Sequence, residues 1–310
     1  MVQRLNTKVA LIGGGPACAS AAIQLIRSGI DILLISEAIG GTIKNANLIE
    51  NLIGFPEGIT GEEYVKLLTE QLKTNSVPIV QDKVLKLERS PSSSYLITTS
   101  KTEVQADIVI VGTGTIPKKL EIEGEELAFK KKKLFYEIWR LKPYSNDKDI
   151  IIIGSGDVAY DYALNLHRKA KSIKILQRSA KTKSLHILQE RVSKKSNIIL
   201  LKSKIPIKIQ VERNLVTLMT KSEDQPGNIK SDFILVAIGR KPNIDYLSPS
   251  LLIEYAEPQQ EPTVFFIGDV KNGNYRQVSI AMGDGVKAAM ETLKRIKEKG
   301  QIDETSRQIW

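Results

Sequence analysis

Apolar and polar residues along the first forty positions predict two strands joined by a helix. Lys8 to Ile12 is apolar enough for a buried strand and runs into Gly13-Gly14-Gly15-Pro16. From Ala17 to Ser28 the apolar residues recur at helical spacing, and Asp31 to Ser36 is a second apolar strand. The order strand, glycine turn, helix, strand is typical of a parallel α/β unit.

The same order returns later in the chain. Asp149 to Ile153 is an apolar strand that enters Gly154-Ser155-Gly156, a helix extends to about Arg168, and a further strand covers Ser172 to Leu176. The first glycines of the two turns are 154 − 13 = 141 residues apart. This distance indicates duplication of a domain type and not a short-period repeat.

Three more apolar strands end at glycine turns, and a long helix follows them. The strands are Asp107 to Val111 before Gly112-Thr113-Gly114, Phe233 to Ile238 before Gly239, and Val264 to Ile267 before Gly268-Asp269. Val278 to Lys297 has helical spacing, and the polar residues from Lys299, Trp310 apart, are expected to be frayed. A chain of 310 residues has material for about two domains. We therefore predict an α/β fold with two Rossmann-like three-layer dinucleotide-binding domains.

The cysteine and histidine content limits the chemistry that the chain can perform alone. Cys18 is the only cysteine, so one chain can form neither an internal disulfide nor a paired-thiol relay. The two histidines, His167 and His186, are too few for most metal sites, and we expect no metal. The chemistry must therefore come from a bound cofactor.

The formal net charge of +10 permits two interpretations. It can serve solubility alone, or it can attract an acidic partner or polyphosphate cofactors. Aromatic residues make up 5% and show no basic-aromatic stripe, which argues against nucleic acid as a partner. The apolar runs are far shorter than the roughly 20 residues that span a bilayer, and no secretory leader is visible. We expect a cytoplasmic protein that does not bind a membrane.

The first glycine turn has the pattern Gly13-x-Gly15-x-x-Cys18. A pyrophosphate needs backbone N–H groups and a helix N-terminus that no side chain covers. Cys18 takes the third position, where a small residue allows the helix to pack closely on its strand. Glu37 follows Gly15 by 22 residues, where an acid accepts hydrogen bonds from a ribose. The alternative is a glycine-rich turn in an α/β domain that binds no nucleotide.

The second glycine turn, Gly154-x-Gly156-x-x-Ala159, keeps the small third residue. Its second strand ends in Gln177-Arg178-Ser179, without the acid that would repel a 2′-phosphate. An arginine there can pair with that phosphate, which favours NADPH over NADH. Alternatively, Arg178 and the nearby Lys181 and Lys183 are solvated cations of a surface loop.

Taken together and in order, these motifs resemble the low-molecular-weight thioredoxin reductase-like flavoproteins over essentially the whole chain. The matching pieces are Gly13 to Ala17, Gly40-Gly41, Glu50-Asn51, Gly54-Phe55-Pro56, Thr60-Gly61, Gly112-Thr113-Gly114, Gly154 to Asp157, Gly239 to Asn243, Gly268-Asp269-Val270 and Tyr275-Arg276-Gln277.

The resemblance implies two cofactors and the residues that hold them. Glu37 would hold the adenosine ribose of FAD, Asp269 the ribityl chain, and Asn51, Arg276 and Gln277 would lie near the flavin ring. The full set implied for FAD is Gly13, Gly15, Pro16, Ala17, Glu37, Gly41, Asn51, Val84, Gly112, Thr113, Gly114, Gly268, Asp269, Arg276, Gln277 and Val278. The set implied for NADPH or NADH is Gly154, Gly156, Asp157, Val158, Arg178 and Gly239.

The resemblance also implies a domain plan. Residues 1–115 and 245–310 would form a split FAD-binding domain, and residues 116–244 would form an NAD(P)-binding domain inserted into it. The protein is expected to be a homodimer.

The chain departs from that family at the redox centre. The family carries a Cys-x-x-Cys pair 14 residues before the second glycine turn, where this chain has Glu137-Ile138-Trp139-Arg140. Thiol–disulfide exchange through the protein is therefore excluded. We expect Glu137 and Arg140 to pair at i, i+3 on a helix, and Trp139 either to stack near the flavin or to fill the space. The family's His-Arg-Arg phosphate reader also keeps only Arg178.

These observations leave three functions. The first is an FAD-dependent NAD(P)H oxidoreductase, with no catalytic residue of its own, that reduces an acidic carrier such as ferredoxin or flavodoxin. The run Lys130 to Lys133 would then steer the carrier, although the same run also suits a mobile, solvated loop. The second is a reductase of a small acceptor such as oxygen, a quinone or free flavin. The third is a flavin-binding scaffold or sensor without turnover.

Overall fold

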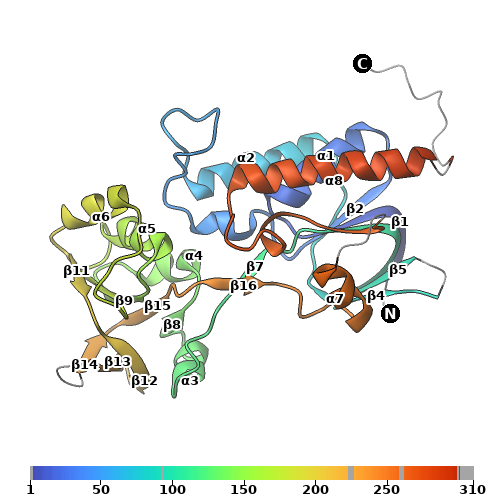
Figure 1. Ribbon diagram of the computed structural model, residues 1–310. Coiled ribbons are helices and arrows are strands. Elements are labelled where there is room, and N and C mark those ends of the chain that lie inside the picture. The colour runs from blue at the N-terminus through green and yellow to red at the C-terminus, as the bar shows by residue number, and fades with distance from the viewer. Residues whose placement is uncertain (1–2, 92–93, 223–226, 258–261, 299, 301–310) are drawn as a thin grey trace. The chain divides into compact units, whose positions relative to one another are not determined.

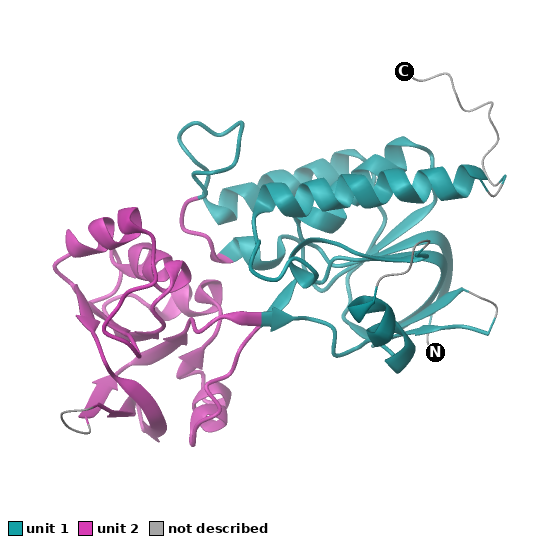
Figure 2. Ribbon diagram, viewed as in Figure 1, with its two compact units in different colours: residues 1–44, 49–116, 241–310 teal, residues 45–48, 117–240 magenta. Residues whose placement is uncertain are grey.

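The chain divides into two compact units, which we describe separately (Figure 2). The computed structural model describes residues 3–91, 94–222, 227–257, 262–298 and 300. The first unit comprises residues 1–44, 49–116 and 241–310, and the second comprises residues 45–48 and 117–240. The chain passes between them through β7 (Thr115–Pro117) and β16 (Arg240–Pro242), which pair with each other. Except for Gly300, the tail that was expected to fray lies outside the described residues.

Within the described residues, the first unit is built on a seven-stranded sheet of order β3-β2-β1-β6-β5-β4, in which β17 also pairs with β6. The strands are β1 (Gln3–Ile12), β2 (Ile32–Ile35), β3 (Ile79–Val80), β4 (Val84–Arg89), β5 (Tyr95–Thr99), β6 (Thr102–Val111) and β17 (Val264–Phe266). β1, β2, β3, β6 and β17 are parallel, whereas β5 is antiparallel to β4 and β6. The long strand β6 pairs first with β5 and then with β17, so the carboxyl ends of β1, β2, β6 and β17 share one edge of the sheet.

Helices α1, α2 and α8 lie on one side of this sheet (Figure 1), and α7 packs against β4. α1 ends in a Schellman turn: the N–H of Ile30 donates to Leu25 and that of Gly29, at a φ of 72°, donates to Ile26. α2 begins with a capping box between Thr60 and Glu63. The helices are α1 (Pro16–Arg27), α2 (Gly61–Thr74), α7 (Pro249–Ala256), α8 (Val278–Glu298), and the 3-10 turns η1 (Gly41–Asn45) and η3 (Gly268–Val270).

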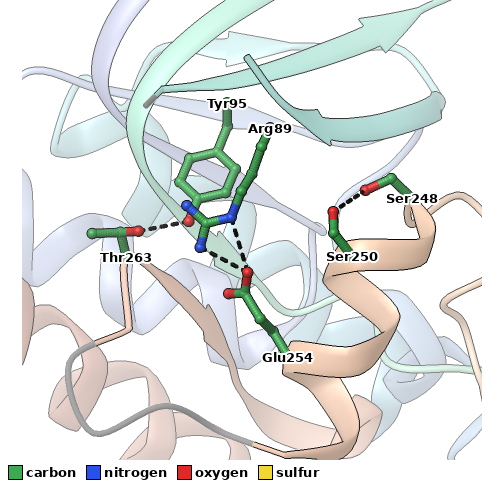
Figure 3. Close-up of polar contacts among 6 residues, drawn as sticks. All are labelled: Arg89, Tyr95, Ser248, Ser250, Glu254 and Thr263. Carbon is green, nitrogen blue, oxygen red and sulfur yellow. Dashed lines mark hydrogen bonds and ion pairs between the residues drawn. The ribbon is translucent and has the colours of Figure 1, made fainter. Parts of the chain in front are cut away.

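A polar cluster fixes α7 to the antiparallel end of the sheet (Figure 3). The Nε and Nη2 atoms of Arg89 on β4 donate to one carboxylate oxygen of Glu254 on α7, at 2.9 and 2.7 Å. The guanidinium also lies 5.1 Å from the ring centre of Tyr95, whose hydroxyl is 2.6 Å from that of Thr263. Glu254 is buried, so this pair offsets part of the cost of removing its carboxylate from water.

The described part of the second unit contains a five-stranded parallel sheet of order β11-β10-β9-β15-β8. Alternate residues of β9 reach different layers: Ile150 and Ile152 pack with α5, and Ile151 and Ile153 pack with the antiparallel strands β12 and β13. Burial on both faces explains why β9 is apolar throughout. The strands are β8 (Leu134–Phe135), β9 (Asp149–Ile153), β10 (Ser172–Leu176), β11 (Ile198–Leu201), β12 (Ile205–Glu212), β13 (Leu215–Lys221), β14 (Gly227–Ser231) and β15 (Phe233–Val236). The helices are α3 (Glu125–Lys130), α4 (Ile138–Leu141), η2 (Lys142–Tyr144), α5 (Asp157–Leu166) and α6 (His186–Ser193).

The predicted α/β fold with two Rossmann-like domains is confirmed, with shifts at several element ends. β1 begins at Gln3, five residues before the predicted start, and pairs there with Thr102 of β6. Apart from the half-buried Leu5, these additional residues are polar, so an apolar pattern does not mark them. β15 ends at Val236, two residues earlier than predicted, because the main chain leaves the sheet before Gly239.

The described residues show neither a membrane-spanning helix nor a metal cluster. No helix there has both the length and the apolar character needed to cross a membrane. In the same part of the chain, no three or more His, Cys, Asp or Glu side chains gather as a metal site.

Candidate functional site

The first glycine turn begins at Gly13, whose backbone contacts the ends of the two neighbouring strands β2 and β6. The N–H of Gly13 donates to the carbonyl of Ile35 at the end of β2, at 2.9 Å. Gly13 has a φ of 125°, and a Cβ added to it would lie 2.3 Å from the carbonyl oxygen of Gly112. A side chain at this position is therefore excluded by backbone conformation and by space.

The turn is open at its other end, where a cofactor would bind. Gly15 has ordinary extended backbone angles and is the N-cap of α1, and no side chain of the described residues caps the helix there. A Cβ added to Gly15 would meet no described atom within 4 Å. Gly41 faces it, since an added Cβ at Gly41 would lie 3.4 Å from the Cα of Gly15, and the N–H of Gly40 donates to Gly14 at 2.7 Å. The uncovered N–H groups of a helix N-terminus between two glycine backbones fit a pyrophosphate.

The carboxyl end of β6 lies directly beside this turn. The N–H of Gly112 donates to the carbonyl of Ile12 at 2.9 Å. The hydroxyl of Thr113 donates to the carbonyl of Asn243 at 2.8 Å, and Gly114 accepts from the N–H of Asn243 at 3.0 Å. The predicted residues Gly112, Thr113 and Gly114 therefore connect the first glycine turn to the chain that returns after residue 240.

Two further predicted segments converge on the same edge of the sheet. Gly268, at a φ of 67°, lies so close to α1 that an added Cβ would be 2.9 Å from the Cβ of Ala17. Asp269 follows in η3 and is half-buried. Asn51 and Gln277, which are 226 residues apart in sequence, meet through a 2.8 Å hydrogen bond from Nδ2 to Oε1. Pro16 occupies the first turn of α1 beside Ala17.

The remaining residues predicted for FAD take more varied positions. Glu37 lies two residues beyond β2 with its side chain exposed. Val84 is buried in the core cluster that contains Ile12 and Ile35, the last residues of β1 and β2. Arg276 is half-buried and Val278 begins α8. The role of each of these residues toward a cofactor stays a prediction.

The single cysteine packs behind the first glycine turn. Cys18 is fully buried, and its Sγ lies 3.4 Å from the carbonyl oxygen of Ile12, to which it donates. A Cβ added to Gly112 would be 2.5 Å from this sulfur. Burial raises the pKa of Cys18 to about 12, because the thiolate would lose its hydration. The residue packs α1 on its strand, as its small size predicts.

The second glycine turn repeats the geometry of the first inside the second unit. The N–H of Gly154 donates to the carbonyl of Leu176 at 3.0 Å, and a Cβ on Gly154 would lie 2.3 Å from the carbonyl oxygen of Ala237. Gly156 caps α5 with extended angles, and an added Cβ there meets no described atom within 4 Å. The same contacts at both turns support the predicted duplication of a domain type.

A loop after β10 folds back onto the second turn. The N–H of Lys183 donates to the carbonyl of Ser155 at 3.1 Å, and that of Leu185 donates to the carboxylate of Asp157 at 2.7 Å. Arg178 is exposed at the start of this loop, and Val158 is exposed on α5. Gly239 follows β15 with a φ of 107° and accepts from the N–H of Lys118.

The buried side chain of Gln177 connects the loop after β10 to α5, a contact that the sequence did not predict. It is fully buried, its Nε2 donates to the hydroxyl of Tyr160 at 2.8 Å, and its Oε1 accepts from Thr182 at 3.2 Å. The only sequence signal was a polar residue at the end of an apolar strand.

The predicted pair between Glu137 and Arg140 is wrong. Glu137 has extended backbone angles and precedes α4, so i, i+3 helical geometry does not apply to it. Its carboxylate accepts from Arg240 at 2.9 Å and from the amide of Asn45. Arg140 instead lies over the ring of Trp139, 4.8 Å from its centre, and Trp139 is 41% exposed. Burial, followed by the charge of Glu137, raises the pKa of the nearby Tyr162.

The Lys130 to Lys133 run is only partly available to a partner. Lys130 pairs with Glu126 at 2.7 Å, and Lys133 donates to the carbonyl of Asn214 at 2.6 Å. Lys131 and Lys132 are exposed in the turn after α3. Steering of a carrier by this run stays a prediction.

Two units that each place a bare glycine turn between a parallel strand and a helix N-terminus define an α/β protein of the dinucleotide-binding class. A family described as pyridine nucleotide-disulphide oxidoreductase matches residues 7–285, so the chain belongs to this family. The family binds FAD and uses NAD(P)H. The predicted resemblance to thioredoxin reductase-like flavoproteins is confirmed, as is the lack of the paired cysteines.

Individual relatives agree with this assignment. The chain is 26% identical to mitochondrial thioredoxin reductase 2 of Saccharomyces cerevisiae over 312 residues, covering 93% of this chain and 91% of that protein. It is 27% identical to an NADH dehydrogenase of Ferdinandcohnia aciditolerans, covering 91% of this chain and 56% of that longer protein. Among solved structures, a thioredoxin reductase of Lactococcus lactis matches with a TM-score of 0.84 and 28% identity, covering 94% of this chain and 99% of that one.

Proposed function

We propose that this protein is an FAD-dependent NAD(P)H oxidoreductase without a dithiol, which passes electrons to an acidic carrier such as ferredoxin or flavodoxin. The observation that supports the proposal is a pair of glycine turns with open helix N-termini, in a chain whose only thiol is buried. Cys18 is held by packing and has a pKa of about 12, so it supplies almost no thiolate at neutral pH. Electrons would then leave the protein from the cofactor directly.

The residues of the first unit would hold and orient FAD. Gly13 and Gly15 leave room for the pyrophosphate, Glu37 would accept from the adenosine ribose, and Asp269 would bind the ribityl chain. Gln277 and Asn51, already bonded to each other, would orient the flavin ring. When bound, FAD supplies a group that takes two electrons from a nicotinamide and can release them one at a time.

The residues of the second unit would hold the nicotinamide nucleotide. Gly154, Gly156 and the N-terminus of α5 would receive the pyrophosphate, with Asp157, Val158 and Gly239 around it. Arg178 supports a preference for NADPH, because an exposed arginine at a strand end can bind a 2′-phosphate in two-pronged fashion. The relative named NADH dehydrogenase supports NADH as a second donor to be tested.

The net charge supports an acidic acceptor. The chain carries a formal net charge of +10, and Lys131 and Lys132 add exposed cations on the second unit. Positive potential raises the encounter rate with an acidic carrier.

A small acceptor such as a quinone, oxygen or free flavin is the second candidate. The engaged state of Lys130 and Lys133 favours it, because half of the lysine run is already bonded within the chain. A small neutral acceptor needs no charged docking surface.

The proposal includes a cytoplasmic homodimer. Support for self-association comes from apolar side chains exposed on α2 and α8, which lie on one side of the first unit (Figure 1): Leu67, Val286 and Met290. Light scattering on the purified protein measures the mass of the particle and decides between monomer and dimer.

An anaerobic absorption spectrum tests the core of the proposal. We expect a yellow protein with one FAD per chain that is bleached by NADPH, and by NADH more weakly. Thioredoxin and a small disulfide dye should be reduced no faster than by free flavin. FMN or no flavin would contradict the FAD assignment, whereas bound FAD that neither nucleotide bleaches would favour a scaffold. Reduction of thioredoxin or of the dye that is faster than by free flavin and survives Cys18→Ala would overturn the expectation that the protein reduces no disulfide.

A further inference from the structure

The carboxylate of Asp284 on α8 bonds both to the turn η3 and to the segment that follows it. The Oδ2 atom of Asp284 accepts from the N–H of Gly268 at 2.9 Å and from the Nδ2 of Asn272 at 2.6 Å. Its Oδ1 atom lies 3.6 Å from the Nζ of Lys271, and the Asp284 side chain is only 18% exposed. These three donors all come from η3 and the residues after it.

The first of these segments carries the residue predicted to bind the ribityl chain. Gly268 is buried and lies against Ala17 of α1, so the turn has little freedom to shift toward the first glycine turn. The N–H groups of Lys271 and Asn272 return to the carbonyl of Gly268 at 3.1 and 3.2 Å. Asp284 therefore accepts the hydrogen bond from the N–H of Gly268, the first residue of the turn that contains Asp269.

The second segment carries the residues predicted to lie beside the flavin ring. Asn272 accepts from the N–H of Tyr275 through its carbonyl at 2.9 Å, and Gln277, two residues further on, bonds to Asn51 at 2.8 Å. The side chain of Asn272 is in turn held by Asp284. One carboxylate thus restrains the start of both segments.

We infer that Asp284 is a positioning residue for the flavin, acting through Asp269 and the segment from Asn272 to Gln277. The inference rests on the proposed FAD site. A carboxylate suits this task because both oxygens accept and neither donates, whereas the three groups that face it all donate. Without it the buried N–H of Gly268 would lose its acceptor, and the turn would rearrange to recover one.

The test compares the dissociation constants of FAD for apoproteins, measured by quenching of flavin fluorescence. Asp284→Ala should weaken FAD binding about 10- to 150-fold, the loss expected for a charge-assisted hydrogen bond. Asp284→Asn keeps one acceptor oxygen and should fall between this variant and the natural protein. Glu291→Ala, on the same helix with an exposed ion pair to Lys287, is the matched control and should change nothing.

A double-mutant cycle with Asp269→Asn separates positioning from general stability. If Asp284 acts through Asp269, then Asp284→Ala should cost at least threefold less in the Asp269→Asn background. Fully additive effects, or an Asp284→Ala protein that binds FAD within about twofold of the natural one, would overturn the inference and leave the proposed function standing. A natural protein that binds no FAD would instead contradict the proposed function itself.

Discussion

At the scale of single residues, burial decides what the only thiol can do. Cys18 is enclosed by α1, Ile12 and Gly112, and its pKa is raised from 9.0 to about 12 because the thiolate would be desolvated. The folded state therefore holds this proton more tightly than the unfolded state. Stability from this group is complete below the unfolded pKa and is lost as pH rises from about 9 toward 12.

We predict that Cys18→Ala removes part of the alkaline destabilisation of the protein. The slope from this one group is at most about 1.4 kcal/mol per pH unit, and the substitution itself should cost about 1 kcal/mol at neutral pH. Urea unfolding at pH 8 and above pH 9, with and without Cys18, measures the difference, and flavin content should stay near that of the natural protein. Equal pH profiles for the two proteins would show that the thiol is ionised in the folded state.

Arg178 gives a second prediction at this scale. Arg178→Ala should weaken NADPH binding by about 1.5–3 kcal/mol, because a charge-assisted pair with the 2′-phosphate would be lost. NADH kinetics should hardly change, and neither Lys181→Ala nor Lys183→Ala should match the effect. Stopped-flow flavin reduction with each nucleotide provides the measurement. An equal loss for both nucleotides would mean that Arg178 does not read the phosphate.

At the scale of elements, substitutions at the two glycines of the first turn should have different effects, one on FAD binding and the other on folding. Gly15→Val has space and permitted backbone angles, so the apoprotein should keep its melting temperature while FAD binding is lost. Gly13→Ala meets the carbonyl oxygen of Gly112 at a φ of 125° and should destabilise the fold itself by about 1–3 kcal/mol. Calorimetry of the two apoproteins, together with flavin content, distinguishes a cofactor defect from a folding defect. A Gly15→Val protein that still binds FAD would place the pyrophosphate elsewhere.

The attachment of α7 gives the second prediction at this scale. Arg89→Ala leaves the buried carboxylate of Glu254 without its partner, so unfolding should become easier by about 1–3 kcal/mol (Figure 3). Arg4→Ala is the control, because its pair with Glu103 is largely exposed and should be worth less than about 1 kcal/mol. Denaturant unfolding of both variants gives the comparison. Equal losses would show that the burial of Glu254 does not matter.

At the scale of the whole molecule, the formal net charge of +10 is a property of the entire chain and not of any single contact. If an acidic carrier is the acceptor, its half-reaction should slow steeply between roughly 0.01 and 0.3 M salt, since the Debye length near 0.1 M is about 10 Å. Replacing Lys131 and Lys132 by Ser should slow it further. Replacing Lys287 and Lys294, which pair with glutamates on α8, serves as the control for net charge.

The two half-reactions must be measured separately, because the nucleotide is also an anion. A neutral quinone should show almost no salt dependence. A flat profile with every acidic carrier tried would remove the carrier proposal and favour the small acceptor.

The sequence by itself determined the local units and the absence of a dithiol. A strand, a glycine turn and a helix are set by residues that are close in sequence. The residues from Gly13 to Ser36 and from Gly154 to Leu176 therefore predicted both glycine turns and the α/β fold class. The cysteine count required no structure. The first half of β1 was missed because it is mostly polar and backbone pairing needs no apolar pattern. The first half of β6 was missed although it alternates buried residues such as Val104 and Ala106 with more exposed polar ones.

Only the tertiary structure decided which distant residues meet. Glu137 bonds to Arg240 and not to its near neighbour Arg140, because the chain is extended at Glu137. Asn51 meets Gln277, and Asp284 holds Gly268, across loops whose closure depends on the order of the strands. Helical spacing places Asp284 on α8 but cannot show that a turn from another segment donates to it. Contacts of this kind depend on sheet order and register, which a single sequence does not encode locally.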